Sequence, residues 1–187
     1  FTSTRSGDLE LYTMNIDGSD VKQITNELGY DGGAFFSPDG SKLIFRSSRP
    51  KTPAEIKKYK DLLADGLVEP VDMELYICDA DGSNLKQLTN LGNANWSPFF
   101  HPSGEKILFS SNHEAERGFP FNLYLIDLDG KNLERVTHGQ TLMPFLFLVM
   151  MENTWPFLPI ETMEAVEIQT YLLHSGKINI KTILCVM

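Results

Sequence analysis

Two polar residues, Asp31 and Asn95, are the first candidates for chemistry, because each begins an apolar run at the same position of a repeated pattern. A ring of carboxylate and amide groups could hold a cation or a polar segment of a protein partner. Alternatively, each side chain ties its loop to the neighbouring repeat by hydrogen bonds, and recurrence in successive repeats favours this structural role. Arg49 and His113, which recur at the end of a later run, are open to the same two interpretations.

The other reactive residue types do not form a known catalytic pattern. Residues 79–84 and 127–130 resemble Asp-rich calcium loops, but the third ligand before the Gly and the Glu at the twelfth position are absent. Neither a Gly-x-Ser-x-Gly motif nor a phosphate-binding loop occurs. The four histidines lack the close pairing of zinc sites, and they are His101, His113, His138 and His174. We therefore expect a chain that is not an enzyme, without catalytic, cofactor-binding or metal-binding residues.

Two interleaved repeats define the elements that position these residues. The first repeat is Leu-Tyr followed by Asp-Gly and a polar run that ends in Thr, and it occurs in residues 10–25, 74–89 and 122–137. The second repeat is a Pro-containing turn followed by an apolar run, and it occurs in residues 35–49 and 99–113. Each full unit therefore contains four apolar or mixed runs and two turns.

These runs are rich in β-branched and aromatic residues and are separated by Asp-Gly or Pro-Asp-Gly, which predicts β-hairpins because Gly and Asp tolerate positive φ. A four-stranded antiparallel unit cannot bury both of its faces alone, so neighbouring units must stack around an axis. The predicted fold class is therefore all-β: a partial β-propeller built of four-stranded antiparallel blades, here a half blade plus two blades.

The two motifs together resemble the TolB-like β-propeller repeat family over residues 1–141. The resemblance implies a binding scaffold in the periplasm, or one that is secreted or envelope-associated, with a protein or peptide as its partner. The chain begins inside another copy of the second motif, so we expect it to be a fragment of a longer protein. Two enzyme alternatives stay open: the gating propeller of a prolyl-oligopeptidase-type serine peptidase, and a propeller enzyme that acts on carbohydrate.

The repeat pattern stops after Thr141, where the first strand of another blade is due. Met and Trp have single codons, so residues such as Met143 and Trp155 fix what the neighbouring reading frame would encode. That frame permits the missing repeat, with an Asp at the position of Asp31 and an Asp-Gly turn at the expected spacing. We predict that residues 142–187 are a frameshifted, non-native tail.

An insertion at residues 51–73 carries the only helix that the pattern predicts. Thr52 and Glu55 form a capping box with Pro at the first helical position, and Ile56, Tyr59, Leu62 and Leu63 mark one apolar stripe. We expect a short amphipathic helix on the face that bears the long loops. Two interpretations are open: the helix shapes a ligand pocket or a partner surface, or it simply covers exposed strand ends.

A second long loop, residues 113–120, is the counterpart of the insertion in the next blade and contains Arg117. The candidate partner-binding residues are therefore Asp31, Arg49, Tyr59, Asn95, His113 and Arg117.

Composition excludes two classes of partner. The net charge of −9 repels nucleic acid and anionic membrane surfaces. The longest apolar run, residues 143–151, is too short to cross a bilayer, which takes about 20 residues as a helix. We therefore expect no nucleic-acid binding and no membrane insertion. The sequence does not define the oligomeric state.

Overall fold

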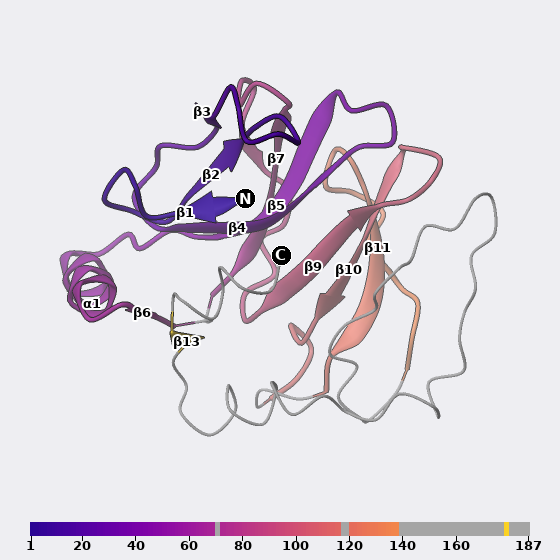
Figure 1. Ribbon diagram of the computed structural model, residues 1–187. Helices are drawn as coiled ribbons and strands as arrows, with labels where there is room; N and C mark the ends of the chain where they lie inside the picture. The colour runs from indigo at the N-terminus through magenta and orange to yellow at the C-terminus, as the bar shows by residue number, and fades with distance from the viewer. Residues whose placement is uncertain (70–71, 117–119, 139–177, 180–187) are drawn as a thin grey trace, which may run out of the picture.

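The computed structural model describes residues 1–69, 72–116, 120–138 and 178–179. Within these residues most of the regular structure is β-sheet, and there is one helix (Figure 1). In chain order the elements are β1 (Thr2–Ser3), β2 (Glu10–Thr13), β3 (Lys22–Gln23), β4 (Tyr30–Phe36), β5 (Lys42–Ser48), α1 (Pro53–Ala64), β6 (Leu67–Val68), β7 (Glu74–Asp79), β8 (Lys86–Gln87), β9 (Asn95–Phe100), β10 (Lys106–Ser111), β11 (Asn122–Asp127), β12 (Glu134–Arg135) and β13 (Ile178–Asn179).

Two four-stranded antiparallel sheets form the main body of the described structure. The first has the strand order β4-β5-β7-β8, and the second has the order β9-β10-β11-β12. A smaller sheet of β1, β2 and β3 precedes them. Neighbouring strands in each sheet are antiparallel, so the prediction of an all-β partial propeller with four-stranded blades is confirmed. Of the predicted tail, residues 142–187, only β13 is described, and its backbone pairs antiparallel with β6.

Asp-Gly turns close the β2–β3, β4–β5, β7–β8 and β11–β12 hairpins, and Ser103-Gly104 closes β9–β10. In the β4–β5 turn the Gly40 amide donates to the Ser37 carbonyl oxygen at 2.8 Å, and the Asp39 carboxylate accepts from the Ser37 hydroxyl at 2.6 Å. In the β7–β8 turn Gly82 has a φ of +88°, and a Cβ atom there would lie 2.4 Å from the carbonyl oxygen of Ile24. Gly82 is therefore required by the backbone conformation and by the close approach of the preceding sheet.

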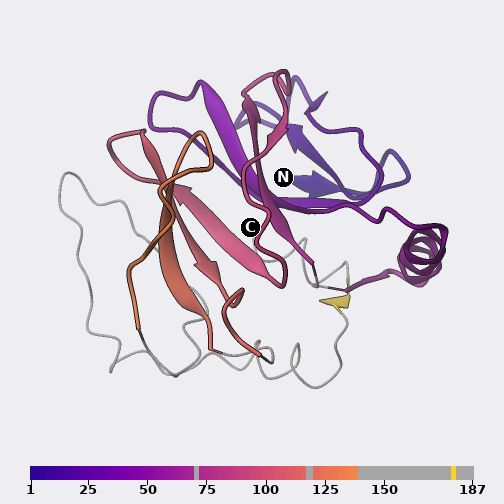
Figure 2. The same cartoon turned by 180° about the vertical axis from the view of Figure 1, so that it is seen from behind.

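The two kinds of connection lie at opposite ends of the sheets. The turns at residues 37–41, 80–85, 101–105 and 128–133 gather at the upper end in Figure 1, and we call this the short-turn end. The helix α1, strand β6 and the loop after β10 lie at the lower end, and we call this the long-loop end; it comprises residues 49–69 and 112–116. Figure 2 shows the same separation from behind.

The core consists of layers between neighbouring sheets. Leu11 of the small sheet packs with Leu43, Phe45 and Cys78 of the first blade. Between the two blades, a second cluster comprises Ile44, Leu75, Ile77, Leu88, Phe100, Ile107, Phe109, Tyr124 and Ile126. Each fully buried apolar side chain of this size contributes about 1.5–3 kcal/mol to stability. Stacking of sheets, rather than any sheet alone, therefore holds the described structure together.

Helix α1 forms where the capping box predicts it. The Thr52 hydroxyl accepts from the Glu55 backbone amide at 3.3 Å, and the Glu55 carboxylate accepts from the Thr52 amide at 3.0 Å. Tyr59 and Leu63 pack on a cluster whose buried members are Leu9, Tyr30, Val68 and Met73. The predicted amphipathic helix is thus confirmed. In the part of the chain that the structure describes, no helix is long and apolar enough to cross a membrane.

Candidate functional site

Asn95 lies at the centre of a hydrogen-bonded cluster that joins the two blades. Its side-chain amide donates to the carbonyl oxygen of Met73 at 2.9 Å and to Oε2 of Glu74 at 3.2 Å. Its side-chain oxygen accepts from the Ser111 hydroxyl at 2.7 Å, and that hydroxyl lies 2.9 Å from Nδ1 of His113. We call the side chains of Glu74, Asn95, Ser111 and His113 the second inter-sheet cluster.

The equivalent positions 64 residues earlier form what we call the first inter-sheet cluster, Glu10, Asp31, Ser47 and Arg49. Nη2 of Arg49 lies 2.7 Å from one carboxylate oxygen of Asp31 and 2.8 Å from the other. Asp31 is fully buried, and Glu10 and Ser47 are 2% and 1% exposed. Oε2 of Glu10 and Oγ of Ser47 have no hydrogen-bond partner among the described atoms. The first cluster is therefore less completely bonded than the second.

A residue shortly after β1, β5 and β10 lies against the Tyr of the Leu-Tyr motif. The three pairs are Arg5 with its guanidinium 4.9 Å from the Tyr12 ring, Arg49 with its guanidinium 5.3 Å from the Tyr76 ring, and His113 with its ring 4.6 Å from the Tyr124 ring. For the two arginines this is the geometry of a cation–π contact. The recurrence supports a structural contribution from Arg49 and His113.

A recurring threonine, which the sequence reasoning did not single out, anchors the strand of each sheet that carries the Leu-Tyr motif, β2, β7 or β11. Its hydroxyl oxygen accepts from a strand amide, and the three bonds are Leu11 to Thr25 (2.9 Å), Leu75 to Thr89 (2.8 Å) and Leu123 to Thr137 (2.9 Å). The Thr89 hydroxyl in turn donates to Glu74 at 2.6 Å. The signal was present, because every copy of the first repeat ends in Thr.

The electrostatics of the first inter-sheet cluster centre on Glu10. The pKa of its carboxyl is raised to about 7; burial is the largest cause, and the negative charges of Asp31 and Asp8 act in the same direction. A hydrogen bond from Thr25 and the positive charge of Arg49 oppose this rise. In the second cluster, burial lowers the pKa of His113, so its ring is held neutral more readily than a free imidazole.

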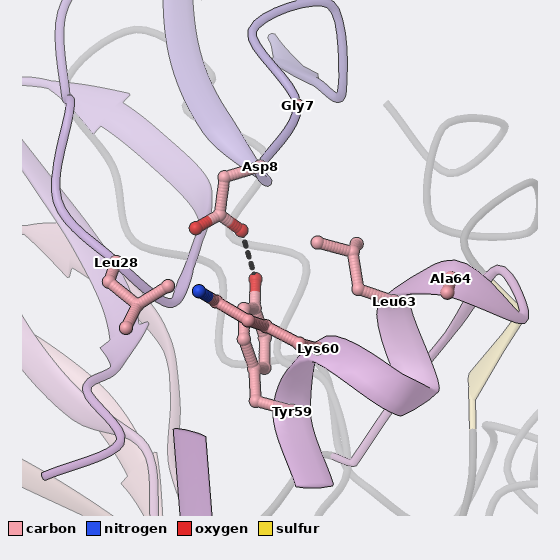
Figure 3. Close-up of a pocket in the computed structure, with 7 residues that line it drawn as sticks. All are labelled: Gly7, Asp8, Leu28, Tyr59, Lys60, Leu63 and Ala64. Atoms are coloured by element: carbon pink, nitrogen blue, oxygen red, sulfur yellow. Dashed lines mark hydrogen bonds between the residues drawn. The ribbon is translucent and has the colours of Figure 1, made fainter. Parts of the chain in front are cut away.

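At the long-loop end, a groove of about 370 Å³ separates α1 from the loop that precedes β2 (Figure 3). Tyr59 and Lys60 extend from the helix toward Asp8, and the Tyr59 hydroxyl donates to the Asp8 carboxylate. Asp8 also accepts from the backbone amides of Leu9 at 2.8 Å and Gly29 at 3.1 Å. Burial raises the pKa of Tyr59 above its usual range, so the hydroxyl stays a donor. The insertion is thereby fastened to the small sheet.

The predicted partner-binding residues fall into separate places. Asp31 and Arg49 meet in the first inter-sheet cluster, and Asn95 and His113 meet in the second. Tyr59 contacts Asp8 at the long-loop end instead. Asp31 and Asn95 are fully buried, and the side chain of His113 is 13% exposed.

Arg117 lies outside the described residues. Partner binding by Asp31, Arg49, Tyr59, Asn95, His113 and Arg117 stays a prediction.

Metal-binding and thiol chemistry have few candidates in residues 1–69, 72–116 and 120–138. Within them, no three His, Cys, Asp or Glu side chains are placed to hold a metal ion. His101 lies in the β9–β10 turn with its Nδ1 2.9 Å from the Ser103 hydroxyl. Cys78 is a buried free thiol, and burial raises its pKa to about 11, which keeps it protonated and unreactive at neutral pH.

Among curated proteins, two relatives match about two thirds of this chain. An uncharacterized protein of Agrobacterium fabrum is 28% identical over 130 residues, covering 67% of this chain and 37% of that protein. A TolB homolog of Chlorobium chlorochromatii is 31% identical over 133 residues, covering 59% of this chain and 30% of that protein. The chain therefore spans about a third of the length of the curated relatives it matches. No family model matches the sequence.

Among solved structures, a putative TolB from Agrobacterium tumefaciens aligns with a TM-score of 0.53 and 26% identity, over 72% of this chain and 43% of that one. TolB from Acinetobacter baumannii aligns with a TM-score of 0.55 and 21% identity, over 75% of this chain and 29% of that one, and supports the fold alone. The fold defines a partial β-propeller with the character of a scaffold or binding module. Over part of the propeller, the chain is similar to a relative and to a solved structure that are named TolB.

Proposed function

We propose that this chain is part of a non-catalytic TolB-like propeller of the cell envelope, whose long-loop end docks a protein or peptide partner. The observation that carries the proposal is the position of α1. The turns at residues 37–41, 80–85, 101–105 and 128–133 lie at the other end, so the longest insertion of the described chain lies on the face that bears the long loops (Figure 1). A rigid scaffold that displays loops at one end is a common arrangement for binding.

The anchoring of α1 supports a docking role. Tyr59 and Leu63 face the scaffold, and the bond from Tyr59 to Asp8 spans 51 positions of sequence. A surface that is held rigidly before the partner arrives loses less conformational entropy on binding than a mobile loop. The insertion therefore fits a preformed interaction surface better than a flexible arm.

The outward face of α1 is charged and exposed. Lys57 pairs with Asp61 and Lys58 pairs with Glu69, and the lysine side chains are 77% and 62% exposed. No residue of the helix is buried. A partner surface with both signs of charge matches this face, and such rim charges affect the association rate and specificity more than the affinity.

In this proposal the six predicted residues divide into two roles. Asp31, Arg49, Asn95 and His113 hold neighbouring sheets together and so keep the long loops in position. Tyr59 fixes the docking helix, and Arg117 of the second long loop provides a contact to the partner. An envelope location agrees with relatives named TolB, and the net charge of −9 disfavours nucleic acid as the partner.

Co-purification tests the proposal. The complete parent propeller is expressed with an affinity tag in its own host, as wild type and with residues 51–73 replaced by a Gly/Ser linker of equal length. We expect one envelope protein to co-purify with the wild type and to be depleted at least tenfold by the replacement.

Charge reversal provides a control that leaves the helix intact. Lys57→Glu with Lys58→Glu changes the exposed face of α1, and Lys131→Glu reverses a charge in the β11–β12 turn at the short-turn end. Loss of the partner with the α1 pair alone supports docking at the long-loop end. Equal recovery from all variants would remove α1 from the binding site.

A further inference from the structure

The two inter-sheet clusters share a plan but differ in chemistry at two positions. Both have a Glu from the preceding sheet and a Ser from the second strand of the next sheet. Asp31 of the first cluster stands where the second has Asn95, and Arg49 stands where the second has His113. The second cluster therefore serves as an internal reference for the first.

The change from amide to carboxylate removes a hydrogen-bond donor. In the second cluster the Asn95 amide donates to Glu74. Asp31 has no such donor, because an ionised carboxylate only accepts. Consistent with this, Oε2 of Glu10 has no hydrogen-bond partner among the described atoms, although the side chain is 2% exposed. A buried carboxylate oxygen without a donor is strongly unfavourable.

Glu10 faces two other carboxylates and one positive charge, which is too little to compensate an ionised Glu10. Asp8 lies ahead of β2, Asp31 lies on β4, and Arg49 follows β5. Nη2 of Arg49 is already engaged with both carboxylate oxygens of Asp31, while its Nη1 has no hydrogen-bond partner among the described atoms. An ionised Glu10 would therefore add an uncompensated negative charge to a buried site, whereas a protonated Glu10 would add none.

A proton also supplies the missing donor. A protonated Oε2 donates a hydrogen bond, and the carboxylate of Asp31 and the hydroxyl of Ser47 are the acceptors that the shared cluster plan provides. Oγ of Ser47 is buried and has no partner among the described atoms, unlike Oγ of Ser111 in the second cluster. One proton thus removes the negative charge of Glu10 and turns its Oε2 into a hydrogen-bond donor.

We propose that the Glu10 carboxyl is a buried proton-binding site between the small sheet and the first blade, and that the bound proton fastens β2 to β4. Two bonds cross this boundary nearby. The Asp31 amide donates to the Leu9 carbonyl oxygen at 2.9 Å, and the Thr2 hydroxyl donates to the Asp31 carbonyl oxygen at 3.2 Å. Loss of the proton weakens the packing of the two sheets that these bonds connect.

Carboxyl NMR of the full 187-residue chain tests the site directly. Glutamate is labelled with ¹³C at Cδ, and the resonances are followed from pH 4 to pH 9 in wild type, Glu10→Gln and the matched control Glu74→Gln. We expect one resonance that titrates near neutral pH in wild type and in Glu74→Gln, and that is absent from Glu10→Gln. The proposal is wrong if every glutamate titrates below pH 5.5.

A second variant tests whether Asp31 causes the high titration midpoint of Glu10. It also gives a result if Glu10→Gln does not fold. Asp31→Asn restores the chemistry of the second cluster, so the Glu10 titration should move down by about one pH unit or more. An unchanged midpoint would contradict the role of Asp31. If the midpoint instead follows the concentration of Na⁺ or Ca²⁺ at constant ionic strength, the site binds a metal cation and the proton proposal fails.

Amide hydrogen exchange measures whether the bound proton stabilises the packing of β2 against β4. The protection factor of the Asp31 amide should fall about tenfold between pH 6 and pH 8, after correction for intrinsic exchange. The Asn95 amide, which donates to Met73 at 3.0 Å, is the matched reference and should not change. Equal behaviour of the two amides would show that the proton does not fasten the sheets.

Discussion

Asp31 and Asn95 share a repeat position and a buried location but impose different requirements on their neighbours. The amide donates to three oxygens and accepts from Ser111. The carboxylate pairs with Arg49 and provides no donor for Oε2 of Glu10. Sequence reasoning could identify the shared position, because it recurs in the chain. It could not identify Glu10, because the clustering of that residue with Asp31 depends on the packing of two sheets.

The stability of the chain should depend on pH through Glu10. Its pKa is raised from 4.5 to about 7 in the folded state, so the contribution of Glu10 is fully present below pH 4.5 and is lost as pH rises through 7. Between these values the free energy of unfolding, taken as wild type minus Glu10→Gln, should fall by about 1.4 kcal/mol per pH unit. Urea unfolding at several pH values measures it, and a difference that does not vary with pH would contradict the assignment.

Asn95→Asp should destabilise the chain at neutral pH. The new carboxylate would face the Met73 carbonyl oxygen and Glu74, and it would lose the donor that both receive now. We expect a loss of about 2–4 kcal/mol in the free energy of unfolding, measured with urea. Asn90→Asp, at an exposed position, is the control and should change stability by less than about 0.5 kcal/mol.

The elements follow local sequence signals closely. Asp-Gly pairs close hairpins because the chain must reverse with a positive φ there, and the capping box with Pro53 starts α1 where the pattern predicts. The partner of each element was harder to predict. Tyr59 was recognised as part of an apolar stripe, but its bond to Asp8 depends on how α1 lies across the small sheet.

Gly82→Ala should cost more than the same change at Gly18. Both residues have a positive φ in the same turn position, +88° and +84°. A Cβ atom at Gly18 has open space, but one at Gly82 would lie 2.4 Å from the backbone oxygen of Ile24. We expect a loss of about 1–2 kcal/mol at Gly18 from the backbone conformation alone, and at least about 1 kcal/mol more at Gly82. Equal losses in thermal unfolding would show that the sheets do not approach here.

Tyr59→Phe should loosen α1 without unfolding the blades. The change removes the only side-chain hydrogen bond that Tyr59 makes to Asp8, a bond to a charged acceptor worth about 1.5–3 kcal/mol. Hydrogen exchange of the α1 amides should accelerate about tenfold or more, while the amides of β5 and β10 keep their rates. Tyr76→Phe, whose hydroxyl contacts exposed Gln87, is the control and should leave α1 unchanged.

At the scale of the whole molecule, the described residues form stacked sheets whose short turns and long loops lie at opposite ends. Internal repeats predicted this architecture, since self-similar four-stranded units bury their faces only against each other. The exposed Phe35 and Phe36, at 41% and 52%, are apolar surface that the described sheets leave uncovered. This agrees with a chain that spans about a third of its curated relatives. The ligand was not predictable, because the same scaffold carries different loops in different proteins.

The central claim, that the partner docks at the long-loop end, is tested most directly by site-specific photo-crosslinking in the complete propeller within its host. A photoreactive residue replaces Lys57 on α1 in one variant and Lys131 in the β11–β12 turn in another; both lysine side chains are 77% exposed. The account predicts a crosslink to one envelope protein from position 57 and none from position 131. A crosslink from position 131 with none from position 57 would contradict it.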